Sequence, residues 1–558
     1  MSAVPSVPKS RSSRLANPDR LFFLVCLVVP LAALALFFLY PLSQIVRRSL
    51  TQGDGSLGFG NYAGVFQLAH IPRVIGNSLL IGGVTTLVCV VLGFAIAFML
   101  QRTKIPGKRL IRVILILPLL APSLVQALGL IFLFGRNGLI NKYLHLDIQI
   151  YGFWGLLIAN CMYALPQAVM ILETSLRRSD ARPYDAALLL GASRWRRFVD
   201  ITFPSAKFGL ISAAFVVFTV SVTDFGNAAV IGGTFQVLAM EIYTQVVGQM
   251  NFNMGAVVGI MLLLPTLLAI YIQRVANQRQ FGGSSDSAVP VVPDYVPLRD
   301  MPLGLVVHAV CLVVFAVVAT VVYASFVKLW PYRLDFTLAN YDISMAGGYE
   351  SLWSTLLISL ETAAIGTFSL FLLALAQRRL GPVAARVVYF LAIVPVGVPG
   401  LVLGLSYVLS FNVSGSMLGA LYGSAFLIAV CNFYHYHSQG FLTMVTGIRS
   451  VPKSLEETVT CMGGSNLHTL RDAVMPVMTP TLVSVFFFLF MRAMVTLSAV
   501  IFLVTPSMTV AAVTVMRLDQ GGKSTQAAAF SVCIMATVLV ATLVMHAILA
   551  FVGRPKAR

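Results

Sequence analysis

RRSDARPYDAALLLGASRWRRFVDITFP, residues 177–204, and RSVPKSLEETVTCMGGSNLHTLRDAVMP, residues 449–476, are two versions of one pattern. Each reads as a short helix, a Gly turn, a second helical stretch and a Pro that opens the next apolar segment. An acid near the start of the short helix, Asp185 or Glu457, suits the positive end of the helix dipole. Two such stretches in one chain predict an internal repeat.

The sequence around these two stretches repeats in the same order. Pro118 recurs as Pro395, 277 residues later, and Gly191 recurs as Gly463, 272 residues later. Residues 273–302 are rich in Gly, Ser, Pro and charge, which predicts a linker between two halves. Each half has six apolar segments, an even number, so both halves enter the membrane from the same side and the repeat is parallel.

The composition requires a membrane. Hydrophobic residues make up 58% of the 558 and charged residues only 10%, and apolar runs of about 20 residues are long enough to cross a bilayer as helices. We therefore predict an all-α polytopic protein of about 12 transmembrane helices in two parallel six-helix repeats. The predicted spans are 21–46, 75–100, 110–134, 151–172, 208–232, 255–273, 303–327, 352–376, 386–410, 418–440, 480–504 and 528–552.

The positive charge is distributed by side. The net charge is +18, but most of the 38 Lys and Arg residues fall in the loops of one side, the side of both termini. The positive-inside rule then predicts cytoplasmic termini and makes the charge a topology signal. We expect a lipid bilayer around the chain and no nucleic acid partner.

The repeated stretch resembles the cytoplasmic coupling loop of type I ABC importer permeases. In that family an acid is followed by two alanines, then after three intervening residues by Gly, and thirteen residues after the Gly by Pro. The first copy has Asp185-Ala186-Ala187, Gly191 and Pro204; the second keeps Glu457, Gly463 and a Pro but not the two alanines. An ordinary amphipathic connector is the alternative for either copy alone.

The resemblance extends over nearly the whole chain and implies its division. It implies a cytoplasmic tail (1–20), a first permease lobe (21–273) with coupling loop 177–204, a cytoplasmic linker (274–302), a second lobe (303–552) with coupling loop 449–476, and a cytoplasmic tail (553–558). Fused permeases of this kind are typical of ferric-iron and 2-aminoethylphosphonate importers, and 222–259 and 494–504 look more like the phosphonate group.

The resemblance also implies the partners. In the family a separate ATPase subunit receives the coupling helices, so ATP and Mg belong to that subunit and this chain needs no cofactor of its own. Two coupling loops on one chain suit an ATPase homodimer. An extracytoplasmic or periplasmic solute-binding protein would deliver the cargo, and the bacterial inner membrane is the expected location. The chain itself is then a permease that works by alternating access and not an enzyme.

Two ionisable residues within predicted spans, Asp224 and Arg492, are candidates for the transport pathway, because charges in a membrane are costly and usually face a cavity or a partner. Arg492 would attract a phosphonate or another anion, and Asp224 an ammonium group. The alternative is an ion pair that joins the two lobes. Four polar span residues are weaker candidates, since such residues more often bond to a neighbouring helix: Asn160, Gln126, Thr223 and Thr496.

Two other classes of protein remain possible from sequence. A secondary transporter driven by an ion gradient can also have twelve spans in two parallel halves, but it would not need two matched coupling loops. A membrane enzyme would need a nucleophile motif, a metal-ligand cluster or paired catalytic carboxylates, and we predict no catalytic residues and no metal site. The expected function is import of a small solute, best 2-aminoethylphosphonate, with ferric iron as the alternative cargo.

Overall fold

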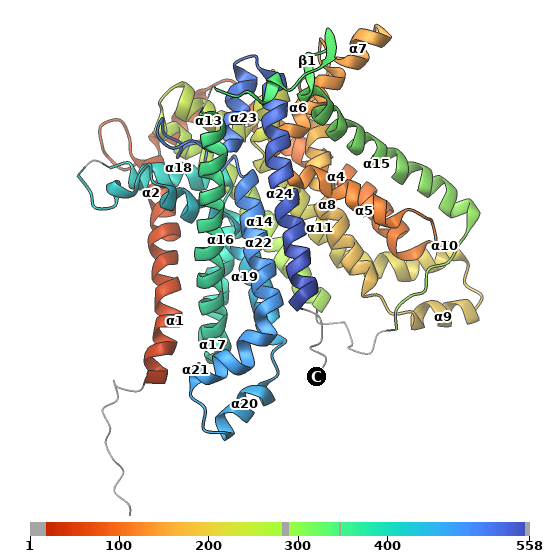
Figure 1. Cartoon of the computed structure of the whole chain (residues 1–558), viewed down its shortest axis with the longest axis vertical. Helices are drawn as coiled ribbons and strands as arrows, with labels where there is room; N and C mark the ends of the chain where they lie inside the picture. The colour runs from red at the N-terminus through yellow and green to blue at the C-terminus, as the bar shows by residue number, and fades with distance from the viewer. Residues whose placement is uncertain (1–17, 282–288, 345–346, 414, 553–558) are drawn as a thin grey trace, which may run out of the picture.

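The computed structural model describes residues 18–281, 289–344, 347–413 and 415–552, and these residues are almost entirely helical (Figure 1). Within these ranges the only named strands are β1 (Val327–Leu329) and β2 (Arg333–Phe336), an antiparallel pair that follows the first helix of the second half. The all-helical fold class predicted from the sequence is therefore confirmed.

The helices occur in the same general order in both halves. The first half contains α1 (Pro18–Leu34), η1 (Ala35–Leu39), α2 (Tyr40–Leu50), α3 (Gly60–Gln67), α4 (Ile71–Arg102), α5 (Lys108–Ile116), η2 (Leu117–Leu120), α6 (Leu124–Phe134), α7 (Leu139–Leu144), α8 (Phe153–Arg177), α9 (Arg182–Leu189), α10 (Arg194–Arg197), η3 (Phe198–Thr202), α11 (Phe203–Thr223), α12 (Gly226–Ile231), α13 (Leu238–Tyr243), η4 (Thr244–Gly248) and α14 (Phe252–Phe281). The second half contains α15 (Pro297–Ser325), η5 (Ala339–Tyr341), α16 (Gly348–Arg379), α17 (Pro382–Ile393), η6 (Val394–Gly397), α18 (Gly400–Phe411), η7 (Gly419–Leu421), α19 (Ala425–Arg449), α20 (Lys453–Cys461), α21 (Asn466–His468), η8 (Thr469–Val474), α22 (Met475–Val495), α23 (Ala511–Gln520) and α24 (Ser524–Val552).

Ten helices in the described ranges are long and apolar enough to cross a membrane, and a bent pair, α17–η6 with α18, makes eleven. A helix also stands at each of the twelve predicted spans. The remaining predicted span, 418–440, corresponds to α19. This helix has 25 residues, but its mean hydropathy is lower than that of the other spans and too low for a typical membrane-spanning helix. Its middle, NFYHYHSQG (432–440), is polar and aromatic, so α19 depends on burial among other helices more than on contact with lipid.

The third predicted span of each lobe is broken by prolines, which have no N–H for the helical hydrogen-bond ladder. In the second lobe the axis bends by 100° between η6 and α18. In the first lobe Pro122 cannot donate to the carbonyl of Pro118, and the buried side-chain amide of Gln126 donates to that carbonyl instead, at 2.7 Å. The Gln126 side chain therefore supplies the hydrogen bond that Pro122 cannot make. This is a structural role, as expected if the polar residues of the spans bond to helices and not to cargo.

The fifth predicted spans, 208–232 and 480–504, are too long. The helix α11 ends at Thr223 and α22 ends at Val495, and each chain then turns before the next short helix. Asp224 is consequently not inside a helical span: it follows the end of α11 and leads into α12. The prediction failed because residues 225–231 continue the apolar run past the helix end.

Matched hydrogen bonds support the internal repeat. Ser78 Oγ on α4 accepts from the N–H of Leu238 at 2.7 Å, and Thr355 Oγ1 on α16 accepts from the N–H of Ala511 at 2.8 Å. These bonds hold the first residue of α13 and of α23 against the second span of each lobe.

A second matched contact is a close approach of a Gly to a Ser, and the two residues occupy opposite positions in the two lobes. A Cβ added to Gly226 would lie 2.3 Å from Ser123 Oγ, and one added to Gly400 would lie 2.3 Å from Ser498 Oγ. Ser123 and Gly400 correspond in the repeat, as do Gly226 and Ser498, so each lobe places one Gly and one Ser at the same crossing. Only one side chain fits between these backbones, and either partner can supply it.

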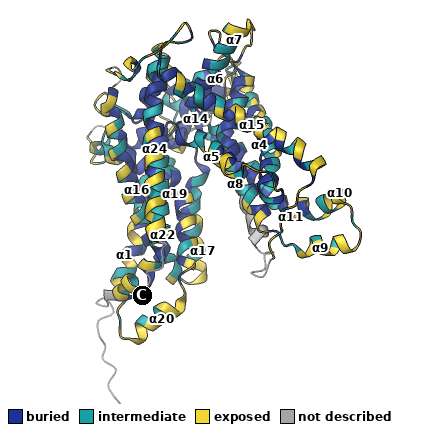
Figure 2. Cartoon of the chain, turned by 45° about the vertical axis from the view of Figure 1, so that its right-hand side comes forward, coloured by how far each residue is buried: buried dark blue, intermediate teal, exposed yellow. Residues whose placement is uncertain are grey.

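The two lobes separate toward the end of the molecule that carries α9 and α20, which we call the coupling end (Figures 1 and 2). They meet near the opposite end, where α14 packs against α18 and Tyr243 stacks on Phe502. The first helix of each half packs on the other half: α1 lies against α16, and α15 lies against α4, α5 and α6. The crossed first helices hold the two lobes together.

Candidate functional site: the coupling loops and the polar groups between the lobes

The two coupling loops fold alike. Each contains a short helix, α9 or α20, which ends at a Gly with positive φ, 72° for Gly191 and 78° for Gly463. Nothing lies within 4 Å of a Cβ built on either glycine, so the backbone angle and not a lack of space requires Gly there. The predicted acids, Asp185 and Glu457, are exposed on α9 and α20.

Each coupling loop presents apolar side chains that nothing in the described chain covers. Leu189 is 89% exposed and Leu190 87%, next to the exposed Ala186, while Ala187 is half-buried. On the second loop Met462 is 83% exposed. Exposed apolar groups concentrated at one place and flanked by charged residues are typical of a surface that binds another protein.

A wide helical turn joins each coupling loop to the fifth span. The turns η3 and η8 are π-helical and stand directly before α11 and α22, whose second residues are Pro204 and Pro476. A proline in the first turn of the next helix cannot donate to the preceding turn, and its ring crowds the carbonyl four residues before it. A π turn accommodates this by widening the backbone. Both coupling loops are therefore connected to their fifth spans by the same element, a π-helical turn.

The chain segment between the lobes packs along the first coupling loop. The N–H of Ala181 donates to the carbonyl of Val289 at 2.9 Å, and the N–H of Val289 donates to the Asp180 carboxylate at 3.3 Å. The N–H groups of Arg182 and Val289 hold the pKa of Asp180 below its usual value. Residues 289–296, within the predicted linker, thus form a strap on the first lobe, and α14 and α15 extend into the rest of its described part.

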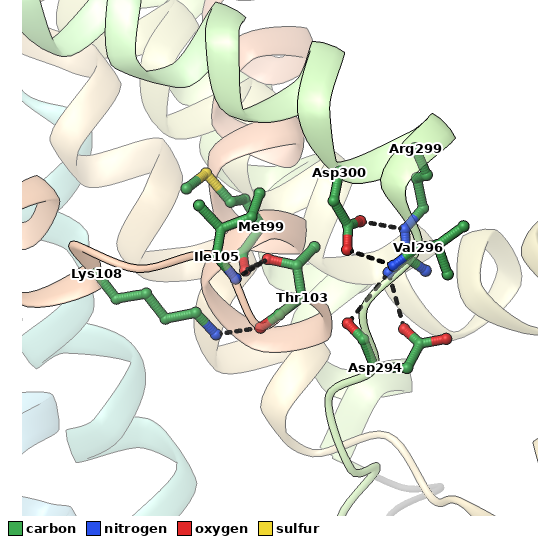
Figure 3. A network of polar contacts seen from close by, with 8 residues as sticks. All are labelled: Met99, Thr103, Ile105, Lys108, Asp294, Val296, Arg299 and Asp300. Carbon is green, nitrogen blue, oxygen red and sulfur yellow. Dashed lines mark hydrogen bonds and ion pairs between the residues drawn. The ribbon is translucent and has the colours of Figure 1, made fainter.

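The strap ends in a polar network at the start of α15 (Figure 3). The Asp300 carboxylate, with no exposed surface, accepts from the N–H of Val296 at 2.9 Å and from Arg299 Nε at 2.6 Å. Arg299 also pairs with Asp294 at 2.8 Å. Asp294 lies beside Thr103 in the α4–α5 loop. The network fixes the beginning of the second lobe to the first.

Asp300→Asn should lower the free energy of unfolding by about 1–3 kcal/mol, because a buried charged hydrogen-bond acceptor is lost and Arg299 keeps only its outer partner. Thermal unfolding in detergent checks this. Asp200→Asn is the matched control: its pair with Arg196 is exposed (60% and 76%), and an exposed pair contributes about 0.5 kcal/mol. Equal unfolding midpoints for the two variants would contradict the role of the network.

Two predicted pathway residues of the first lobe, Asn160 and Asp224, are linked through Asn227. Asn160 Nδ2 donates to Ser221 Oγ at 3.1 Å, and Asn227 Nδ2 donates to Asn160 Oδ1 at 3.1 Å. The Asp224 carboxylate accepts from the N–H of Asn227 at 2.9 Å and interacts with Ser123. The Thr223 hydroxyl donates to its own helix. These bonds tie the start of α12 to α8 and α11.

Arg492 is the centre of a second group. Its guanidinium carbon lies 5.5 Å from the ring centre of Tyr436, and its guanidinium interacts with the hydroxyl of Tyr163, on α8 of the other lobe. Thr496 Oγ1 donates to the Arg492 carbonyl at 2.7 Å and lies 2.9 Å from the Tyr436 hydroxyl. In the described chain no carboxylate pairs with Arg492, so the alternative of an Asp224–Arg492 ion pair is not present in this structure.

Sequence reasoning missed the residues that surround these groups. Tyr163 in α8 and Tyr436 in the aromatic middle of α19 carry no local signal. Arg102 and Arg378 were visible as the basic ends of two second spans, but their contacts with the coupling loops needed the fold. The two arginines contact equivalent carbonyls of the two fourth spans, those of Leu176 and Ile448.

Comparison with known proteins agrees with this architecture. The family described as binding-protein-dependent transport system inner membrane component matches residues 89–282 and 369–555, once in each lobe. A ferric transport system permease protein of Haemophilus influenzae is 29% identical over 506 residues, 87% of this chain and 78% of that protein. A 2-aminoethylphosphonate transport system permease protein of Salmonella typhi is 25% identical over 266 residues, 46% of this chain and 92% of that protein.

A crystal structure of a bacterial ABC transporter involved in the import of the acidic polysaccharide alginate matches 48% of this chain and 97% of its own, with 18% identity and a TM-score of 0.40. The family match is the stronger finding, because its two copies together include more than half of the residues and fall one on each side of the strap. The chain belongs to the binding-protein-dependent transport system inner membrane components, as a fused permease with both lobes in one polypeptide.

Proposed function

We propose that this inner-membrane ABC importer permease moves a small anionic or zwitterionic solute, best 2-aminoethylphosphonate, between its two lobes by alternating access. The family is one of transport permeases and not of catalytic enzymes, and it implies an ATPase and a solute-binding protein as partners. In the proposal the ATPase is a separate homodimer that carries ATP and Mg, and its two copies receive α9 and α20. The coupling end and both termini face the cytoplasm.

The matched, exposed surfaces of α9 and α20 are the observation that carries the ATPase docking. Each is a short helix with exposed apolar side chains at its end, and each is joined to the fifth span of its lobe through a Gly turn, a second short helix (α10 or α21) and a π turn. A helix that is fixed at one end and exposed along its length can receive a partner and transmit a rigid-body motion. A gradient-driven transporter, considered from the sequence, has no use for two such surfaces, and membership of this family excludes it.

The environment of Arg492 favours an anion over ferric iron as cargo. Among the described residues no carboxylate pairs with the Arg492 guanidinium, which hydroxyl and aromatic groups of both lobes contact. Such a group repels a cation and offers donors to a phosphonate oxygen. Asp224 lies in a separate group and would meet the ammonium of a zwitterion. Relatives named for ferric and for 2-aminoethylphosphonate transport both match this chain, so the comparisons do not choose between the two cargoes. The positive charge of Arg492 is the observation that favours the anionic cargo.

The purified chain should retain the ATPase when the two are expressed together, and uptake should be sensitive to vanadate. A solute-binding protein loaded with 2-aminoethylphosphonate should stimulate ATP hydrolysis by the complex, whereas the same protein exposed only to ferric iron should not. Stimulation by ferric iron alone would replace the anionic cargo by the metal. An ATPase that never co-purifies would contradict the proposed partner.

A further inference from the structure

An arginine at the end of each second span holds a coupling helix in place. In the first lobe Arg102 is the last residue of α4 and is buried. Its Nη2 donates to the carbonyl of Leu176, near the end of α8, at 3.2 Å. Its guanidinium carbon lies 5.3 Å from the ring centre of Tyr184, in α9. One side chain therefore touches the second span, the fourth span and the coupling helix.

The second lobe has the same arrangement with different chemistry. Arg378, in the last turn of α16, donates to the carbonyl of Ile448 and, at 2.9 Å, to that of Val451. Its Nη2 lies 2.6 Å from Glu456 Oε1, in α20. Ile448 and Glu456 stand 272 residues after Leu176 and Tyr184, the offset of the coupling loops. An ion pair in one lobe thus takes the place of a cation–π contact in the other.

The position of these arginines suits a mechanical role. The last carbonyls of a helix lack donors from their own helix, and a buried guanidinium can satisfy them while its remaining edge or face holds a neighbouring segment. Tyr184 passes the connection on, because its hydroxyl donates to Thr202 Oγ1 in η3 at 3.0 Å. The coupling helix is thereby attached to the second and fourth spans as well as to the fifth.

We propose that Arg102 and Arg378 are positioning residues that attach each coupling helix to the second and fourth spans, so that motion of a docked ATPase moves the whole lobe. The proposal rests on the proposed coupling to an ATPase. Neither arginine touches cargo or nucleotide: each acts through the helix that it holds. Without the attachment the coupling helix can still bind the ATPase, but it moves on its π turn without carrying the lobe.

The test uses the complete complex of this chain, its ATPase and its binding protein in vesicles, with labelled 2-aminoethylphosphonate and ferric iron as parallel probes. Arg102→Gln and Arg378→Gln should each retain the ATPase and basal ATP hydrolysis. The solute moved per ATP hydrolysed should fall about fivefold or more, as expected from the loss of a charged hydrogen bond. Lys104→Gln and Arg379→Gln are matched controls, because they remove the same charge from exposed residues one or two positions away and should leave the ratio unchanged.

Conservative variants separate positioning from folding. Tyr184→Phe keeps the ring under Arg102 and should keep most of the ratio, whereas Tyr184→Leu should lower it as Arg102→Gln does. Glu456→Gln leaves both carbonyl bonds of Arg378 in place and should give an intermediate ratio. Unchanged ratios in both arginine variants, or equal ratios for Tyr184→Phe and Tyr184→Leu, would overturn the proposal. A wild-type complex without ATP-dependent uptake of either probe would instead refute the proposed function.

Discussion

Replacing both coupling-loop glycines, as Gly191→Val with Gly463→Val, should reduce ATP-dependent uptake on the order of tenfold to a hundredfold. Both glycines have left-handed backbone angles, φ 72° and 78°. A residue with a Cβ pays about 1–2 kcal/mol in that region, and a β-branched one adapts poorly. Each loop then leaves its turn, and α9 and α20 no longer point away from the lobes. Uptake in vesicles by the complex measures the loss.

The matched control is Asn at the same two positions. Asn visits the left-handed region more readily than other residues with a side chain, and open space surrounds both sites, since nothing lies within 4 Å of a built Cβ. The Asn variant should keep most of the wild-type uptake, and both variants should insert in the membrane to the same extent. Normal uptake by the Val variant would show that the direction of the coupling helices does not matter.

Arg492→Gln should reduce uptake of an anionic solute by roughly tenfold to a hundredfold, because a charge-assisted hydrogen bond in a dry site contributes about 1.5–3 kcal/mol. Gln keeps a donor and much of the length of Arg but loses the charge. Arg492→Lys keeps the charge but not the planar set of donors, so its uptake should lie between that of the wild-type protein and that of Arg492→Gln. The measurement is the concentration dependence of 2-aminoethylphosphonate uptake with the binding protein in excess.

Asp224→Asn tests the other half of a zwitterion site. It preserves an oxygen that can accept from the N–H of Asn227, so α12 should keep its position, and only uptake of solutes with an ammonium group should fall. An equal loss for phosphonates with and without the ammonium would exclude contact between Asp224 and that group.

For the Arg492 prediction, wild-type uptake by Arg492→Gln in an intact complex would reject contact between Arg492 and the cargo.

The sequence was most informative where structure is local. The short coupling helices and their terminal glycines follow from neighbouring residues, and the structure has both where they were predicted. Asp185 lies in the first turn of α9 as expected, whereas the acid in the first turn of α20 is Glu456 and the predicted Glu457 follows it. The parallel repeat was readable because Pro and Gly keep their order even where other residues differ. Matched bonds such as those of Ser78 and Thr355 now support that alignment in space.

Hydropathy could not reveal where helices end inside an apolar region. Apart from Asn227, residues 225–231 are apolar and look like a continuation of α11, although the chain turns at Asp224 and starts α12. The contacts of Arg492 with Tyr163 and of Arg102 with Tyr184 join residues distant in sequence. No periodicity or spacing encodes such pairs, because they depend on how helices of different spans pack.

Uptake by vesicles that contain this chain, with and without the ATPase, tests most directly whether an outside motor drives the lobes through α9 and α20. Vesicles with the chain, the ATPase, the loaded binding protein and ATP should accumulate labelled 2-aminoethylphosphonate, and omission of the ATPase or of ATP should abolish accumulation. Accumulation by the chain alone, driven by an ion gradient, would contradict the account.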